Sequence, residues 1–290
     1  MSLAGAQHKL AVVLQDNELY EPAGSMPSTH ILKPDHPDGN YPHSVVNEWF
    51  AMRLAGKLEL EVPEVRRLYV PEPVYLIDRF DRFQRDGEWQ RRHLIDACQM
   101  LGLDRSFKYV QGSVQNLGEI ANACRSPAVA RLRLFGWLVF NMLIGNSDAH
   151  LKNLSFQVSA EGIQLAPHYD LLSVAVYDSE SFNQKGWPEQ TRLAWAVQER
   201  QTFAELNRPT MLQAGDAMGL AKATAARLLD HQLERIEKAA QSLHEEIEKE
   251  NERLARNQPD LGGTFAGESR CLRAVQYGVI REMTRKLRKG

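Results

Sequence analysis

The chain has 290 residues, of which 43% are hydrophobic and 25% are charged. These near-average values exclude a collagen-like chain, a coiled-coil fibre and a largely disordered protein. With 35 Lys and Arg residues against 37 Asp and Glu residues, the net charge of −2 also argues against a protein that coats nucleic acid non-specifically.

The cysteines and the apolar stretches restrict the class of protein further. Cys98, Cys124 and Cys271 are far apart, which excludes a disulfide framework or a Cys-x-x-Cys metal site and favours reduced thiols. The longest apolar stretch, residues 135–144, is about half of the ~20 residues that a transmembrane helix needs. No secretory signal opens the chain. We therefore expect a cytoplasmic protein without a membrane partner.

The first eighty residues have the pattern of a small, strand-rich lobe. A loop of small residues leads into an apolar strand pattern, a polar turn and a second short strand. The β-branched run 29–33 ends at Lys33. Apolar residues then recur at helical spacing from Ser44, which we expect to cap a helix that contains Glu48. Residues 65–80 again have an extended pattern.

Helical patterns dominate from about residue 93 onward, with a long apolar segment at 132–144. A strand pair is expected within 153–168, and helices are expected within 209–256. Seven Lys or Arg residues accompany an apolar stripe in 270–290. Two interpretations of this last segment stay open. It is either an amphipathic helix that packs on the large lobe with its charges in water, or a basic surface that faces DNA or an acidic protein partner.

The segment GNSDAHLKN, residues 145–153, lies between an apolar helix pattern and a strand pattern. Its Asp148 and Asn153 have the separation of the catalytic Asp and the metal-binding Asn in the catalytic loop of protein kinases. Phosphoryl transfer needs a carboxylate that accepts the proton of the attacking hydroxyl, and oxygen ligands for Mg²⁺. The alternative is that Asn146, Asp148 and Asn153 only form turns through hydrogen bonds to the backbone.

Three further residues match parts of a phosphoryl-transfer site. Asp170, in HYDLL, follows the next strand pattern, where a protein kinase places its main Mg²⁺ ligand. Its alternative role is to cap a following helix. Lys33 can bring its ammonium to nucleotide phosphates, and Lys9 lies in a loop of small residues whose N–H groups can approach phosphate. Each lysine can equally be a solvated surface residue. The order of all these features is that of a kinase with two lobes, which favours the catalytic interpretation.

Seven strings, in this order, resemble the HipA-type serine/threonine kinase toxins of bacterial toxin–antitoxin systems. They are SLAGAQHK (2–9), THILK (29–33), SVVNEWFAMRLA (44–55), DRFDR (78–82), CQMLGL (98–103), GNSDAHLKN (145–153) and LAPHYDLLS (165–173). The resemblance implies an α+β, bilobal protein-kinase-like fold, with a small nucleotide-binding lobe at 1–80 and a mainly helical catalytic lobe at 81–290. It also implies ATP and Mg²⁺ as cofactors, and a Ser or Thr hydroxyl of a protein as acceptor.

Carried over residue by residue, the resemblance makes Asp148 the catalytic base and makes Asn153 and Asp170 the Mg²⁺ ligands. The main chain from Asp78 to Phe80 becomes the hinge that receives the adenine, although the family more often has Glu in place of Asp78. The nucleotide-binding residues that it implies are Ala4, Gly5, Ala6, Gln7, His8, Lys9, Lys33, Asp78, Arg79, Phe80, His150, Leu151, Lys152, Asn153, Tyr169, Asp170, Leu171 and Leu172.

Ser2 matches a loop serine whose autophosphorylation inactivates family members. A phosphate there would add negative charge beside the nucleotide phosphates and drive the loop outward. The alternative is that Ser2 is a disordered terminal residue. Family members of the long type carry a further N-terminal subdomain before this loop, so we expect either a truncated chain or a subdomain supplied by a separate protein. The residues after Tyr109 read VQGSVQN, without the family's usual glycine pair, which predicts an altered choice of substrate.

The resemblance also implies partners. These are a helix-turn-helix antitoxin resembling HipB, contact with DNA only through that antitoxin, and an aminoacyl-tRNA synthetase as a protein substrate. Two other functions stay open. One is a non-catalytic corepressor that binds an antitoxin on operator DNA, and the other is a kinase of small molecules.

Overall fold

The computed structural model describes residues 8–16, 18–24 and 26–289, and it combines sheets and helices as the sequence predicts. Its N-terminal part is an antiparallel sheet with the strand order β2-β1-β3-β5-β4. The strands are β1 (Leu10–Gln15), β2 (Glu18–Tyr20), β3 (His30–Pro34), β4 (Val65–Tyr69) and β5 (Pro73–Asp78). Side chains alternate between the two faces of this sheet. Tyr75 and Ile77 join the main core, whereas Val74 and Leu76 join a small second core on the opposite face.

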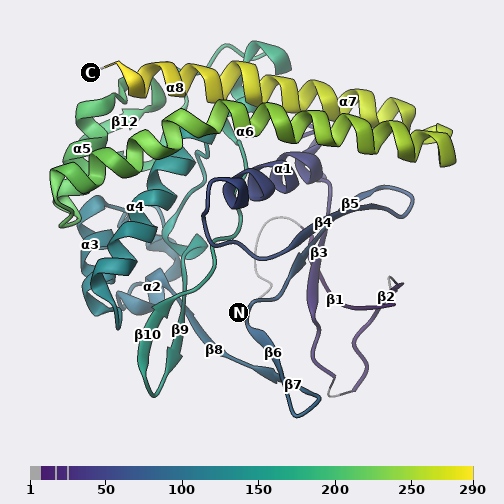
Figure 1. The fold of residues 1–290 in the computed structure, drawn as a ribbon, viewed down its shortest axis with the longest axis horizontal. Coiled ribbons are helices and arrows are strands. Elements are labelled where there is room, and N and C mark those ends of the chain that lie inside the picture. The colour runs from purple at the N-terminus through teal and green to yellow at the C-terminus, as the bar shows by residue number, and fades with distance from the viewer. Residues whose placement is uncertain (1–7, 17, 25, 290) are drawn as a thin grey trace.

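Helix α1 (Ser44–Lys57) covers the inner face of this sheet and is itself covered by the C-terminal helices (Figure 1). The prediction that Ser44 caps α1 is wrong, because Ser44 is the first helical residue and His43 occupies the cap position in a left-handed conformation. Asp35 provides the acceptor instead, since its Oδ1 receives the Val45 N–H at 2.7 Å. The Ser44 hydroxyl accepts the His36 N–H at 2.7 Å.

The rest of the chain is mainly helical (Figure 1). Its helices are α2 (Ala97–Met100), α3 (Val114–Ala123), α4 (Pro127–Ile144), α5 (Arg208–Ala217), α6 (Lys222–Asn257), α7 (Gly262–Arg273) and α8 (Arg281–Arg288). A π-helical segment, Ala274–Ile280, joins α7 to α8. Short 3₁₀ turns lie at Arg105–Phe107, Leu151–Asn153, Ala175–Asp178, Glu180–Phe182, Phe203–Glu205 and Pro259–Leu261. The predicted helical region 209–256 is therefore two helices, which separate near Gly219, where φ is +80°.

Smaller sheets complete the fold. Strands β8 (His93–Asp96), β9 (Ser155–Ser159) and β10 (Gly162–Leu165) form one sheet, and the hairpins are β6 (Arg82–Arg85) with β7 (Glu88–Arg91) and β11 (Arg192–Val197) with β12 (Arg200–Thr202). The strand pair predicted within 153–168 is confirmed by β9 and β10. The position of the boundary between two lobes, after residue 80, stays a prediction.

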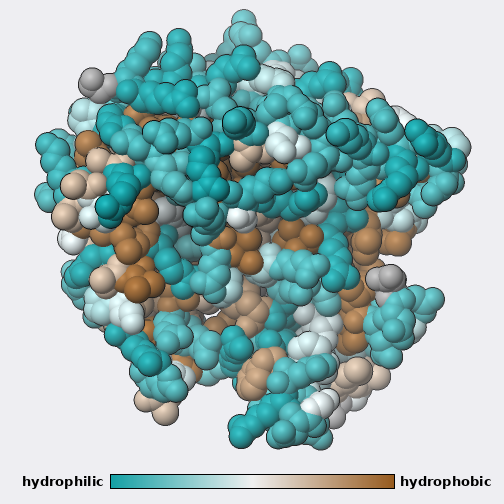
Figure 2. All heavy atoms as spheres, in the orientation of Figure 1, coloured by the Kyte–Doolittle hydropathy of each residue, from teal (hydrophilic) through white to brown (hydrophobic). Residues whose placement is uncertain are grey.

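The C-terminal helices pack as the amphipathic interpretation predicts. Val275, Val279, Ile280, Met283 and Leu287 are buried, whereas the arginines of this segment are exposed. The apolar stripe of α6 is also buried, at Leu233, Ile236, Ala240, Leu243 and Ile247. Figure 2 shows that hydrophilic residues cover the outer face of α6. Whether the exposed arginines also contact a partner stays a prediction.

Helix α4 is longer than the apolar stretch expected from the sequence. Its 18 residues, Pro127–Ile144, are long and apolar enough to cross a membrane by length and composition alone, and 61% of that window is buried inside the described structure. α4 packs against α3 and α6. Packing in the core is therefore a sufficient reason for its apolar composition.

Candidate active site

The loop GNSDAHLKN begins where α4 ends, and Asn146 joins it to the segment that carries Asp170. Gly145 caps α4 with φ +66°, and a Cβ there would lie 2.7 Å from Val279 Cγ1. The Asn146 side chain accepts the Asp148 N–H at 3.1 Å, and its amide donates to the Asp170 carbonyl at 3.4 Å and to Asn141 Oδ1 at 2.8 Å. Asn146 therefore forms the turn that the alternative interpretation predicts, and it also sets Asp148 and Asp170 relative to each other.

Asp148 and Asn153 lie at the two ends of one short turn. The Asn153 amide donates to the Asp148 carbonyl oxygen at 3.0 Å, which leaves Asn153 Oδ1 as the acceptor atom of that side chain. The Asp148 carboxylate is half-buried and accepts a hydrogen bond from the Tyr109 hydroxyl at 2.5 Å. The turn therefore presents a carboxylate and an amide oxygen from a rigid segment of the chain.

Lys33 joins β3 to α1 and to the Asp170 segment. Its Nζ lies 2.6 Å from Glu48 Oε1 and 2.8 Å from Asp170 Oδ1. The three side chains are only 7%, 5% and 25% exposed, and the ammonium also lies 5.5 Å from the centre of the Tyr75 ring. A buried lysine thus bridges two carboxylates that are 122 residues apart in the chain, and the solvated alternative for Lys33 is wrong.

Burial and neighbouring charge act in opposite directions on this cluster. Burial lowers the pKa of the Lys33 ammonium, but the carboxylates of Asp170 and Glu48 outweigh that effect and raise it. Burial raises the pKa of Glu48, and Lys33 only partly offsets this. Burial would also raise the pKa of Asp170, but the charge of Lys33 holds it well below its usual range. Asp170 is therefore the ionised carboxylate of the cluster, and Glu48 is the one that protonates first.

Asp170 does not cap a helix. Its backbone is left-handed, with φ 59°, and the next 3₁₀ turn begins at Ala175 with Val174 as its cap. The Asp170 side chain instead bonds to Lys33. The alternative interpretation of this residue is therefore wrong.

A cavity between the sheet and the Asp170 segment brings together residues that the sequence predicts to bind nucleotide. It is lined by Lys9, Ile31, Lys33, Glu48, Ile77, Asp78, Arg79, Phe80, Tyr169 and Asp170. The hinge is fixed on one side by the Arg79 N–H, which donates to the Thr29 carbonyl at 2.9 Å. The rings of Phe80 and Tyr169 both line the cavity, and their centroids lie 5.6 Å apart. Seven predicted nucleotide-binding residues therefore share one cavity.

Other predicted nucleotide-binding residues lie away from the lining of this cavity. Leu151 and Leu171 are buried in the main core, and Leu172 is partly exposed. Lys152 Nζ forms an ion pair with Asp96 Oδ2 at 2.5 Å, at the end of β8. His8 is exposed. The predicted roles of Ser2, Ala4, Gly5, Ala6 and Gln7 fall on residues outside the described ranges.

His150 packs against Tyr109, with ring centroids 5.1 Å apart. Burial, and then the charge of Lys108, lower the pKa of the His150 ring, so the ring is neutral near pH 7. Its Nδ1 is buried and has no hydrogen-bond partner among the residues that the structure describes. His150 therefore contributes a neutral ring that packs beside the turn between Asp148 and Asn153.

Sequence reasoning missed several polar residues that hold the site together. Asn47 on α1 donates to the Ser173 carbonyl and accepts the Ser173 N–H, both at 2.9 Å, and it is fully buried. Asn141 on α4 receives the Asn146 amide. In the sequence, each of these asparagines interrupts an apolar helical pattern, and a buried polar residue of this kind indicates a hydrogen bond inside the protein.

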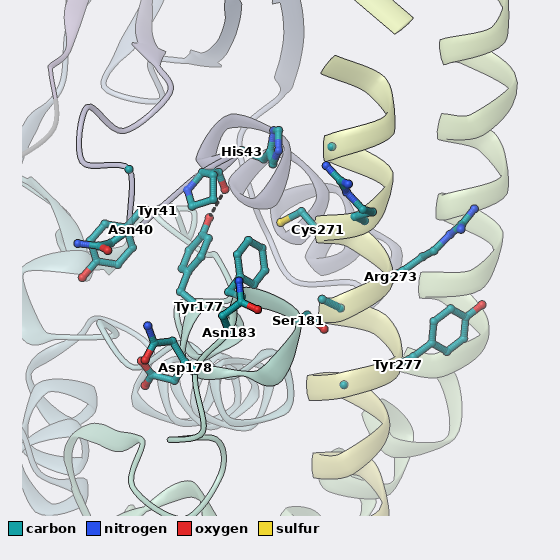
Figure 3. Close-up of a pocket in the computed structure, with 18 residues that line it drawn as sticks. Asn40, Tyr41, His43, Tyr177, Asp178, Ser181, Asn183, Cys271, Arg273 and Tyr277 are labelled. Atoms are coloured by element: carbon teal, nitrogen blue, oxygen red, sulfur yellow. Dashed lines mark hydrogen bonds between the residues drawn. The ribbon is translucent and has the colours of Figure 1, made fainter. Parts of the chain in front are cut away.

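A larger pocket of about 1090 Å³ contains none of the predicted site residues (Figure 3). It lies between the loop before α1, the segment around Tyr177 and the α7–π-helix face. The Tyr177 hydroxyl donates to the Pro42 carbonyl at 3.2 Å at its edge (Figure 3). Tyr41, Arg273 and Tyr277 also line it. Its mixed lining does not indicate one class of ligand.

The cavity with Lys33 and Asp170 has the donor set for a nucleotide with Mg²⁺. Within the lining, the Asp170 carboxylate is the hard oxygen ligand that Mg²⁺ prefers and the Lys33 ammonium suits phosphate, whereas Asn153 does not line the cavity. No group of three or more His, Cys, Asp or Glu side chains forms a metal cage in the described part of the chain.

Comparison with known proteins identifies the relatives of this chain. The model of the HipA-like C-terminal domain family matches residues 1–240. "Putative kinase Y4mE" of Sinorhizobium fredii is 34% identical over 246 residues, which cover 81% of this chain and 56% of that protein. The "Serine/threonine-protein kinase toxin HipA" of Shewanella oneidensis is 37% identical over 202 residues, which cover 64% and 45%. The chain thus spans about half the length of the curated relatives that it matches.

Two solved structures resemble the fold. The Shewanella oneidensis complex of HipA, HipB and operator DNA matches with a TM-score of 0.74 and 28% identity, over 98% of this chain and 67% of that one. The Helicobacter pylori proinflammatory kinase CtkA matches with a TM-score of 0.57 and 16% identity, over 95% and 90%. These likenesses confirm the α+β, protein-kinase-like fold that the sequence predicts.

Proposed function

The chain belongs to the HipA-like C-terminal domain family, and we propose that it is the catalytic part of an ATP- and Mg²⁺-dependent serine/threonine protein kinase. The observation that carries the proposal is the cluster in which Lys33 bridges Glu48 and Asp170 at 2.6 and 2.8 Å. Asn146 links that cluster to the turn with Asp148. A base, an ammonium and two oxygen ligands are the groups that phosphoryl transfer needs from a protein.

Each residue has one role in the proposed reaction. Lys33 holds the nucleotide phosphates, and Asp170 with Asn153 Oδ1 holds Mg²⁺. When bound, Mg²⁺ neutralises charge that develops on the phosphates. Asp148 accepts the proton of the acceptor Ser or Thr hydroxyl. The hydroxyl oxygen forms the new bond to the γ-phosphorus, while the bond between that phosphorus and the ADP oxygen breaks.

We further propose that the protein acts in the cytoplasm as the toxin of a toxin–antitoxin system. The name of the Shewanella relative and the HipA, HipB and operator DNA complex support this proposal. A helix-turn-helix antitoxin resembling HipB is the proposed partner, with DNA reached through it and an aminoacyl-tRNA synthetase as the proposed substrate.

Transfer of label from [γ-³²P]ATP tests the proposal, with dephosphorylated casein and total bacterial protein as acceptors. We expect labelled Ser or Thr residues, and a loss of about 10²–10⁴ in rate for Asp148→Asn, because a positioned base contributes about that much. Asp216→Asn, on the exposed surface of α5, is the matched control and should keep the wild-type rate. Undiminished turnover in Asp148→Asn would remove Asp148 from the role of base.

Two further results would favour the other functions. Label that enters only small molecules would identify a kinase of metabolites. Binding of an antitoxin without any transfer by the wild-type chain would identify a non-catalytic corepressor.

A further inference from the structure

We propose that Tyr109 positions the catalytic base: its hydroxyl holds one carboxylate oxygen of Asp148 and thereby directs the other oxygen at the acceptor hydroxyl. The inference rests on the proposed function and assigns a role to a residue outside the predicted site set. It concerns the acceptor side of the site, because Tyr109 does not line the cavity that contains Lys33 and Asp170.

The contact to Asp148 is direct and specific. The Tyr109 hydroxyl donates to Asp148 Oδ1 at 2.5 Å, and the tyrosine is 38% exposed. No other side chain or backbone group donates to the Asp148 carboxylate within the described ranges. A carboxylate has two oxygens, and one strong donor is enough to fix the plane of the group. Oδ2 therefore remains available for the proton of an acceptor hydroxyl.

The segment that carries Tyr109 is tied to the catalytic turn. The Leu151 N–H, within that turn, donates to the Lys108 carbonyl at 3.2 Å. The Gly112 N–H donates to the Tyr109 carbonyl at 2.9 Å, which closes a tight turn around the tyrosine. The ring packs on His150, and Lys108 Nζ lies 4.6 Å from its centre on the ring face. These contacts fix the ring on more than one side.

A third element holds the two segments together. The Trp195 indole N–H, on β11, donates to the Ala149 carbonyl at 3.0 Å. A Cβ on Gly112 would lie 2.4 Å from Trp195 Cγ, so the Trp195 ring lies directly on the backbone at Gly112. The tryptophan therefore contacts the chain next to Asp148 and the chain three residues after Tyr109. Because Trp195 contacts both of these segments, it holds Tyr109 in a fixed position beside Asp148.

This arrangement has a defined consequence for the transfer step. The acceptor hydroxyl gives its proton to Asp148 Oδ2, its oxygen bonds to the γ-phosphorus, and the bond from that phosphorus to the ADP oxygen breaks. Reaction through a correctly oriented pair is much faster than through a freely rotating one. Loss of the Tyr109 hydroxyl should therefore lower the rate of transfer without changing the binding of nucleotide.

Tyr109→Phe tests the proposal, because it keeps the ring and removes only the hydroxyl. We expect kcat for phosphorylation of dephosphorylated casein to fall about five- to fiftyfold, as for the loss of one hydrogen bond to a charged group that water partly replaces. KM for casein and the Kd of a non-hydrolysable ATP analogue with Mg²⁺ should stay within about twofold. Tyr277→Phe is the matched control, since this 43% exposed tyrosine donates to Gln241 Oε1 at 2.8 Å, and it should keep the wild-type values.

Several outcomes would overturn the proposal while the proposed function stands. An active wild type with an unchanged kcat in Tyr109→Phe would show that the hydroxyl does nothing for transfer. A higher kcat would make Tyr109 an obstacle to the acceptor. A change confined to KM for casein, or a loss of nucleotide affinity as large as the loss of kcat, would show that Tyr109 acts on binding and does not position Asp148. A wild-type chain that labels no protein would instead refute the proposed function, and this inference would fall with it.

Discussion

Replacing Asp170 by Asn should weaken Mg²⁺-dependent nucleotide binding, whereas Asp148→Asn should leave that affinity nearly unchanged. Asp170 lines the cavity beside Lys33 and is largely buried, and a hard divalent cation prefers a charged oxygen to a neutral amide. Asp148 lies outside the cavity lining and bonds to Tyr109 on the acceptor side. The two variants should therefore differ in a measurement of nucleotide binding, even though the proposed reaction needs both carboxylates.

The magnitude follows from the charges of the cluster. Asp170 is the ionised carboxylate beside the Lys33 ammonium, so Asp170→Asn removes one negative charge from the place where the cation would bind. Changes to groups that only support a metal ligand already cost about 10–100-fold in metal affinity, so a direct ligand should cost at least as much. That loss corresponds to about 1.4–2.7 kcal/mol. For Asp148→Asn we expect a change within about threefold.

Isothermal titration calorimetry with a non-hydrolysable ATP analogue, in Mg²⁺ and in EDTA, measures this difference. The loss in Asp170→Asn should be large in Mg²⁺ and small in EDTA. An equal loss in both buffers would show that Asp170 acts through Lys33 and the phosphates and not through the metal. A larger loss in Asp148→Asn than in Asp170→Asn would reverse the roles assigned to the two carboxylates.

Two further predictions concern stability, measured by urea unfolding. Lys33→Met should cost about 3–5 kcal/mol at pH 8, because it leaves the buried carboxyl groups of Glu48 and Asp170 without their cation. The cost should be smaller at pH 5, because burial raises the pKa of Glu48 and the carboxyl group is then closer to its neutral form. A group whose pKa is raised by folding stabilises the folded state at low pH, and this contribution is lost as the pH rises through that pKa. Equal costs at both pH values would contradict this reasoning. Glu268→Leu should also cost about 3–5 kcal/mol, because it leaves Arg67, which is 1% exposed, without its carboxylate, whereas Arg285→Ala in an exposed pair should change stability by less than about 1 kcal/mol. A small effect of Glu268→Leu would show that Arg67 finds another partner.

The sequence predicts the groups of the site better than it predicts how they are held. Lys33, Asp170 and the hinge at Asp78 share one cavity, as the order of their motifs along the chain predicts. This works because residue type and order express the chemistry of phosphoryl transfer directly. The helix that begins at Ser44 and the strand pair within 153–168 lie where hydrophobic periodicity predicts them, whereas β11 and β12 lie where only helical patterns were expected.

The supporting contacts were missed because they join segments that only the folded chain brings together. Asn146 forms a turn, as the alternative interpretation of its loop predicts, but its hydrogen bond to the Asp170 carbonyl spans 24 residues. Lys152 was predicted to contact nucleotide, whereas its ammonium lies on Asp96 at the end of β8. β8 pairs with β9, and this places Asp96 opposite Ser155. Such a register depends on tertiary packing and is not visible in either segment alone.

The position of Glu48 is set by contacts remote from the nucleotide cavity. Beyond α1, Arg67 on β4 forms a buried ion pair with Glu268 on α7 at 2.7 Å, and its guanidinium lies 4.5 Å from the Trp49 ring of α1. A regulator that moved α1 away from Lys33 would have to break the buried pair between Lys33 and Glu48, at a cost of about 3–5 kcal/mol, and the contact of Arg67 with Trp49. A regulator that withdrew only the Tyr109 hydroxyl from Asp148 would break one half-exposed hydrogen bond to a charged group, worth about 1.5–3 kcal/mol. Because a ligand shifts an equilibrium only by its difference in affinity for the two states, the acceptor side is where a weakly binding partner can control transfer.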